Sequence, residues 1–177
     1  MRCPTRTPCG TRSSPGSGHA LRQNLHRIPR SETQTTQCGA AVIDFGTVET
    51  GWKPNTFLVA PAGVCKRARP DLKSPLWRVD AARLMAEIDA IFAAMERTRR
   101  TDISSDGLAV TYVQKTAGLG FPDIVSVQVF PMTDKSGKPA SALGIFSRSR
   151  YGIVDFGVNR RRVNHVLNTL RSSLPTA

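Results

Sequence analysis

The stretch DIVSVQVF, residues 123–130, alternates between apolar and polar side chains, and this pattern decides the predicted fold. Its three valines fall on one face of an extended strand, while Ser126 and Gln128 fall on the other. A period of two over such a length is typical of a half-buried β-strand. The stretch therefore predicts a sheet with one face packed in a core.

Three further stretches predict neighbouring strands joined by short turns. Residues 99–104 precede a Ser-Asp-Gly turn at 105–107, and Asp-Gly is a strong hairpin signal. Residues 108–114 alternate in the same way, and residues 140–150 follow the turn TDKSGKP. Because short connections join antiparallel neighbours, the sequence predicts a four-stranded antiparallel meander.

Helical periodicity flanks the predicted meander on both sides. Asp80 is a suitable N-cap, and apolar residues recur at helical spacing over residues 81–95. A second helix is predicted over about residues 160–171, with Asn159 as its N-cap. The order helix, four strands, helix predicts an α+β fold in which both helices cover one face of the sheet.

Two segments precede the first predicted helix. Residues 1–40 carry six arginines and one glutamate among many Pro, Gly, Ser and Thr residues, which predicts a disordered basic extension. A transit peptide, a nucleic-acid-binding arm and an artefact of an upstream start are the alternatives for this extension. Residues 41–177 are predicted to form a single domain, which begins with an ordered but irregular, proline-rich segment.

Charge indicates the class of partner. The formal net charge is +12, and residues 1–40 and 144–177 each contribute +5 of it. Two basic ends favour an anionic partner, either a small anion or an anionic lipid head group. The alternative is that they only form a basic surface without a specific partner. Nucleic acid is not favoured, because only Tyr151 and Phe156 are aromatic among the C-terminal arginines.

The compartment is less well defined than the charge. No apolar stretch is long enough for a transmembrane helix, and residues 1–40 contain no apolar core of a secretory signal. A cytoplasmic location is the default expectation from these absences. The sequence makes no prediction of the oligomeric state.

The densest cluster of charge is RSRYGIVDFGVNRRRV, residues 148–163, which holds five arginines and one aspartate. Arg148 and Arg150 are predicted to leave the last strand on one side. With Asn159 as N-cap, the three arginines at 160–162 occupy the first positions of the helix, where positive charge opposes the helix dipole. This stretch at residues 148–163, the basic corner, therefore requires negative charge nearby.

That negative charge has two candidate sources. Asp155 or Asp123 can supply it from within, and the corner is then a structural clamp between the last helix and the sheet. A bound phosphate, carboxylate or lipid head group can supply it from outside, and the corner is then an anion site. The candidate ligand-binding residues are Arg148, Arg150, Asp155, Asn159, Arg160 and Asp123.

No motif identifies a reaction. The cysteines lack zinc-site spacing, Cys65 is expected to be a small buried side chain, and no metal or cofactor is predicted. The two Asp-Phe-Gly triplets, at 44–46 and 155–157, are interpreted as turns. The leading hypothesis is a non-catalytic binding or structural domain.

Two other hypotheses remain open. One is a hydrolase or transferase of unknown class that uses Asp123 or Asp155 as a general base. The other is a protein that attaches to anionic membranes or nucleic acid through its basic tail.

Three blocks of the chain, PNTFLVAPAGVC, FPDIVSVQVFP and SRSRYGIVDFGVNRRRV, resemble domain-of-unknown-function family 1499, found in bacteria and plastids. The resemblance spans about residues 45–170 and implies a single domain without an established activity. Many relatives carry a membrane segment or lipoprotein signal, which implies a cell-envelope location. The residues that match the recurring pattern are Cys65, Asp123, Arg148, Ser149, Arg150, Gly152, Asp155, Gly157, Asn159, Arg160 and Val163.

Overall fold

A computed structural model describes residues 42–51, 54–117, 120–151 and 156–177 of the chain. The predicted extension, residues 1–40, lies outside the described residues, as does Asp155. The domain boundary at residue 41 therefore stays a prediction.

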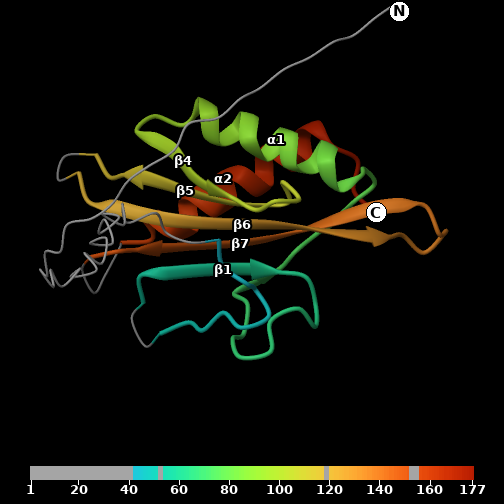
Figure 1. The fold of residues 1–177 in the computed structure, drawn as a ribbon, viewed down its shortest axis with the longest axis horizontal. Helices are drawn as coiled ribbons and strands as arrows, with labels where there is room; N and C mark the ends of the chain where they lie inside the picture. The colour runs from blue at the N-terminus through green and yellow to red at the C-terminus, as the bar shows by residue number, and fades with distance from the viewer. Residues whose placement is uncertain (1–41, 52–53, 118–119, 152–155) are drawn as a thin grey trace, which may run out of the picture. The chain divides into compact units, whose positions relative to one another are not determined.

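Seven strands and two helices are formed by the described residues (Figure 1). The strands are β1 (Thr56–Ala60), β2 (Leu72–Lys73), β3 (Leu76–Trp77), β4 (Thr98–Ile103), β5 (Ala109–Lys115), β6 (Pro122–Thr133) and β7 (Pro139–Ser149). The helices are α1 (Ala81–Ala94), between β3 and β4, and α2 (Val158–Ser173), after β7. The α+β class is confirmed.

The sheet is mixed, and its long path runs β2-β1-β7-β6-β5-β4, with β3 pairing separately with β7. Strands β4 to β7 pair antiparallel with their neighbours in the chain, as the hairpin signals predicted. The prediction of only four strands was wrong, since β1 pairs antiparallel with β7 and β2 pairs parallel with β1. The sequence TFLVA of β1 has apolar residues buried on both faces and therefore no alternation.

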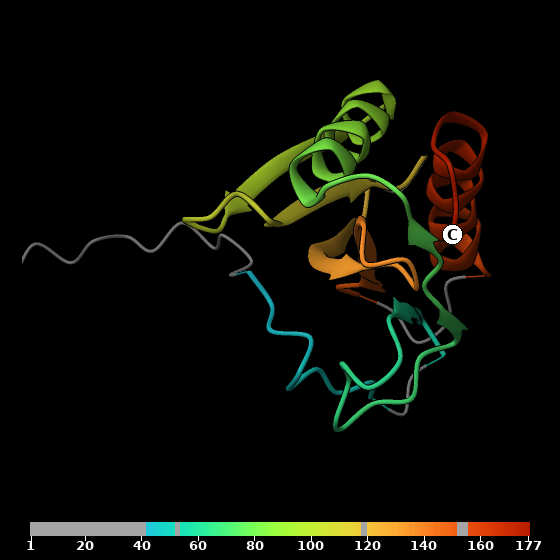
Figure 2. The same cartoon turned by 90° about the vertical axis from the view of Figure 1, so that its right-hand side faces the viewer.

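The main core lies between the sheet and the two helices. Figure 2, which looks along the strands, shows α1 and α2 on one face of the sheet. The three valines of the central stretch, at 125, 127 and 129, are buried on this face. They pack in one cluster with the apolar stripes of both helices, which include Leu84, Ile88, Phe92, Val163, Val166, Leu167 and Leu170.

The opposite face of the sheet carries a second, smaller core. Its buried members are Phe45, Val48, Leu58, Ala60 and Phe146, so the proline-rich segment covers this part of the sheet (Figure 2). A Cβ atom at position 144 would lie 2.9 Å from the ring of Phe45. Glycine at this position of β7 therefore allows the ring to approach the strand.

The two helices begin in different ways. Asp80 caps α1, as predicted, because its Oδ1 accepts a hydrogen bond of 2.8 Å from the backbone N–H of Arg83. The prediction of Asn159 as the N-cap of α2 was wrong. Gly157 is the cap, with a φ of 76° that glycine adopts at little cost, and Asn159 is a fully buried residue of the first turn.

Candidate functional site at the start of α2

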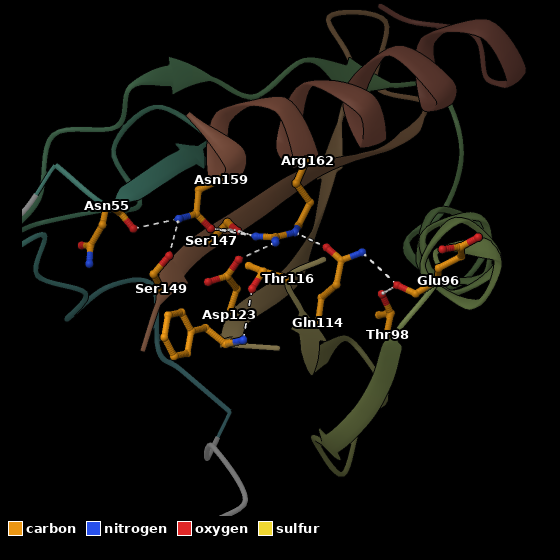
Figure 3. Close-up of polar contacts among 11 residues, drawn as sticks. Asn55, Glu96, Thr98, Gln114, Thr116, Asp123, Ser147, Ser149, Asn159 and Arg162 are labelled. Carbon is orange, nitrogen blue, oxygen red and sulfur yellow. Dashed lines mark hydrogen bonds and ion pairs between the residues drawn. The ribbon is translucent and has the colours of Figure 1, made fainter. Parts of the chain in front are cut away.

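The first turns of α2 contain a buried ion pair with the sheet (Figure 3). Nη2 of Arg162, on α2, donates to Oδ2 of Asp123, on β6, at 2.6 Å. Their side chains are 5% and 1% exposed, so both charges have left water. Such a pair is tolerated only when the remaining polar atoms also find partners.

Arg162 finds these partners on two other strands and on its own helix. Its Nη1 donates to Ser147 Oγ and to Asn159 Oδ1, each at 2.7 Å. Its Nε donates to the side-chain oxygen of Gln114 on β5. The guanidinium therefore ties α2 to β5, β6 and β7 at once, through the fixed donor geometry that distinguishes arginine from lysine.

Asn159 extends the network towards β1. Its Oδ1 accepts a hydrogen bond of 2.6 Å from Ser147 Oγ. Its Nδ2 donates to the backbone oxygen of Asn55 at 2.8 Å and to Ser149 Oγ at 3.2 Å. The side chain thus joins the first turn of α2 to the residue before β1 and to the end of β7 (Figure 3).

Strand register explains why these side chains meet. Asp123 of β6 pairs with Ser149 of β7, and Val125 pairs with Ser147. Because alternate residues share a face, Asp123, Ser147 and Ser149 all point towards the helices. The apolar stripe of α2, which begins at Val163, packs α2 against this face and brings the preceding Arg162 over the strands.

The structure brings together only part of the predicted candidate set. Asp123 and Asn159 lie in one network, but Arg162, which was not among the candidates, connects them. A signal for Arg162 existed in the sequence, because it precedes Val166 by four residues and so shares the buried face of the helix. The sequence-based prediction placed Arg162 in the helix but included only Arg160 of the three consecutive arginines in the candidate set.

Arg148 lies on the opposite face of the sheet from Asp123. It pairs in register with Ile124, one residue beyond Asp123, and alternation separates the two side chains. Its guanidinium carbon lies 5.6 Å from the centroid of the Phe146 ring. Burial lowers the pKa of the half-buried Arg148 guanidinium, and Arg148 has no ion pair with a described acidic residue.

Arg150 and Arg160 are exposed and rest on aromatic rings. The guanidinium carbon of Arg150 lies 5.7 Å from the ring centroid of Tyr151, just after β7. That of Arg160 lies 5.3 Å from the ring centroid of Phe57, on β1. Neither forms an ion pair with an acidic residue in the described part of the chain.

Cys65 and a cavity beside α1 are two further features of the described residues. Burial raises the pKa of the Cys65 thiol, which favours the protonated and less nucleophilic form. A cavity of about 370 Å³ between α1 and β4 is lined by Asp89, Arg100 and Tyr112, among others. In this cavity Asp89 accepts a hydrogen bond from the Tyr112 hydroxyl. It also forms an ion pair with Arg100, with Nη1 of Arg100 3.2 Å from Oδ2 of Asp89.

No helix among residues 42–177, apart from the gaps, has the length and apolar character needed to cross a bilayer. In the same part of the chain, no three His, Cys, Asp or Glu residues lie close enough to form a metal site.

A family model described as "Protein of unknown function (DUF1499)" matches residues 48–170. The chain belongs to this family. The matched range contains the whole sheet, α1 and most of α2, and therefore Asp123, Asn159 and Arg162. No curated protein matches the chain.

Proposed function

We propose that this DUF1499 protein is a non-catalytic binding domain in which Arg148, Arg150 and Arg160 bind an anionic ligand. The Arg162–Asp123 pair, on the helix-covered face of the sheet, is a clamp that fixes α2 on the sheet. The basic corner can therefore be both a structural clamp and an anion site, because different arginines serve these two roles.

The observation that carries the proposal is the division of charge at this end of the sheet. Asp123 is bound by Arg162. Arg148, Arg150 and Arg160 have no ion pair with any described acidic residue, and aromatic rings lie beside them instead. Cations without a carboxylate partner, held in place by packing, are the groups that phosphate and carboxylate ligands require.

The start of α2 adds to this potential. Arg160 lies in the first turn, whose free N–H groups carry a partial positive charge, and α2 has no acidic residue in that turn. Cations at this position repel the helix dipole, and a bound anion would relieve that repulsion.

The geometry disfavours Asp123 as the general base of an enzyme. A general base must reach the substrate and be free to accept its proton. The Asp123 side chain is 1% exposed and one of its oxygens is occupied by Arg162. Asp155, the other candidate base, lies outside the described residues.

Titration with inorganic phosphate tests the proposal. We expect the triple variant Arg148→Gln, Arg150→Gln, Arg160→Gln to weaken phosphate binding by about tenfold or more, because charge-assisted hydrogen bonds are lost. Binding is measured by chemical shift changes of backbone amides in the full chain, at fixed ionic strength.

A charge-matched control separates a site from general electrostatics. Lys66, Arg99 and Lys138 are exposed on three separated parts of the fold, and their replacement by Gln removes the same charge. Phosphate binding should then change by less than about twofold. Equal losses in the two triple variants, or no phosphate binding by the wild type, would overturn the proposal.

A further inference from the structure

Three large aromatic side chains are exposed at the end of the sheet where α2 begins. Phe121, Tyr151 and Phe156 are 48%, 56% and 85% exposed. They precede β6, follow β7 and precede α2, respectively. Exposed aromatic groups gathered at one end of a fold indicate an interaction surface, whereas scattered ones do not.

Backbone contacts place these residues at the same end. The N–H of Arg150 donates to the oxygen of Pro122 at 3.2 Å, and the rings of Phe121 and Tyr151 are 6.3 Å apart. Phe156 directly precedes Gly157, the cap of α2. Asn159 in turn links the first turn of α2 to Ser149, at the end of β7.

Phe156 is held outward in a strained conformation. Its φ is 50°, in the left-handed region that aromatic residues rarely adopt, and Nη1 of Arg161 donates to its carbonyl oxygen at 3.0 Å. An aromatic residue that is both strained and 85% exposed contributes little to a core. Strain of this kind is typical of functional sites, where it fixes the position of a side chain.

Arginines contact two of these three aromatic residues: the guanidinium carbon of Arg150 lies 5.7 Å from the Tyr151 ring centroid, and Arg161 donates to the Phe156 carbonyl oxygen. Arg150, Arg160 and Arg161 are exposed, and Arg148 is half-buried nearby on β7. Aromatic side chains favour the head-group region of a bilayer, where their apolar rings leave water, and arginines there bind lipid phosphates. The combination is complementary to an anionic lipid surface in both charge and polarity.

The same features fit other ligands less well. A small free anion gains nothing from a ring as exposed as that of Phe156. Bases of single-stranded nucleic acid stack on flat, separate rings, but Phe121 and Tyr151 contact each other at an interplanar angle of 54°.

We infer that this end of the domain binds the surface of a bilayer that contains anionic phospholipid. Phe156 enters the head-group region, Phe121 and Tyr151 lie beside it, and the arginines contact the phosphates. The inference rests on the proposed anion-binding role of Arg148, Arg150 and Arg160 and adds the identity of the occupant.

Vesicle sedimentation of the full chain tests the role of Phe156. The vesicles contain phosphatidylglycerol and phosphatidylcholine in equal parts, and vesicles of phosphatidylcholine alone are the reference. We expect Phe156→Ala to weaken binding to the anionic vesicles about tenfold, because one aromatic side chain no longer leaves water. The variants differ at single positions, so any charge effect of residues 1–40 is common to all.

Met132 provides the matched control. It is 44% exposed near the other end of β6, roughly 36 Å along the strand from Phe121 at about 3.3 Å per residue. Met132→Ala should leave vesicle binding unchanged. Tryptophan fluorescence gives a second readout. On addition of anionic vesicles, the emission maximum of the tryptophan in Phe156→Trp should shift to the blue, and that of the tryptophan in Met132→Trp should not.

The outcomes separate the two proposals. If phosphate binds to the arginines but Phe156→Ala sediments like the wild type, the bilayer inference fails and the proposed function survives. If neither phosphate nor anionic vesicles bind, both fail. Tighter, Phe156-dependent binding to a single-stranded oligonucleotide than to vesicles at the same salt concentration would also overturn the bilayer inference.

Discussion

Arg162 and Arg160 lie two residues apart on α2 and have opposite environments. Arg162 is 7% exposed and meets four side chains, among them a carboxylate. Arg160 is exposed and meets the ring of Phe57. The role of each arginine here therefore follows from its position relative to the apolar stripe of the helix.

Energetics make the contrast testable. Removing one member of a buried ion pair leaves the other charge in a poorly solvated place, and this costs several kcal/mol. An exposed cation near an aromatic ring contributes about 1 kcal/mol or less. The buried arginine should therefore control stability and the exposed arginines should control binding.

The largest effect is expected for Arg162→Met. The change leaves Asp123 buried without its cation and Ser147 and Gln114 without a donor, so the unfolding free energy should fall by about 3–5 kcal/mol. Urea denaturation of the full chain measures the loss. If Arg162→Met is too unstable to purify, Arg162→Lys retains the charge and should show a smaller loss.

A double variant isolates the ion pair from the other contacts. Arg162→Met combined with Asp123→Leu removes both charges, so it should be more stable than the sum of the two single losses predicts, by about 1–3 kcal/mol. Strict additivity of the two losses would show that Asp123 and Arg162 do not stabilise each other.

A half-buried cluster gives an intermediate case. Tyr112 donates its hydroxyl to Asp89, Arg100 forms an ion pair with the same carboxylate, and the Tyr112 ring is stacked on Phe92 with centroids 4.1 Å apart. Burial raises the pKa of the Tyr112 hydroxyl, and the hydrogen bond to Asp89 raises it further. The folded state therefore retains a proton that an unfolded tyrosine releases at about pH 10.

The direction of the pH effect follows from this difference. The stabilisation from Tyr112 is complete below about pH 10 and is lost as the pH rises above it. We expect Tyr112→Phe to lower the unfolding free energy by about 1 kcal/mol at pH 7. Between pH 9 and 11, the unfolding free energy of this variant should fall less steeply than that of the wild type. Urea denaturation across this range measures both. A slope for Tyr112→Phe as steep as that of the wild type would refute the assignment.

Much of the fold could be predicted from local patterns. The alternation at 123–130 and the Asp-Gly turn at 106–107 indicated β6 and the hairpin from β4 to β5, and the structure contains both. Strands β2 and β3 have two residues each, which is too short for any periodicity to be recognised. Their pairing depends on contacts between distant parts of the chain, which no local pattern encodes.

The site was only partly predictable for a related reason. The charge pattern indicated that the arginine run needs negative charge from Asp155, Asp123 or a bound anion, but not which arginine would meet Asp123. That choice depends on the start of α2, and Gly157 in a left-handed conformation competes with Asn159 as the cap. The separation of Arg148 from Asp123 follows from the sheet register, which only the paired strands define.

The smallest effect on stability is expected for Arg160→Gln. Loss of the contact with Phe57 destabilises the fold by about 0.5–1 kcal/mol, and relief of the repulsion with the α2 dipole stabilises it by about 0.3–1 kcal/mol. These terms oppose each other, so the unfolding free energy should change by less than about 0.5 kcal/mol in urea denaturation. Added phosphate should nevertheless stabilise the wild type more than this variant, because the binding site of the variant has one cation fewer to contact the phosphate. A loss of 2 kcal/mol or more without phosphate would place Arg160 in the clamp with Arg162, and the contrast between the two arginines would disappear.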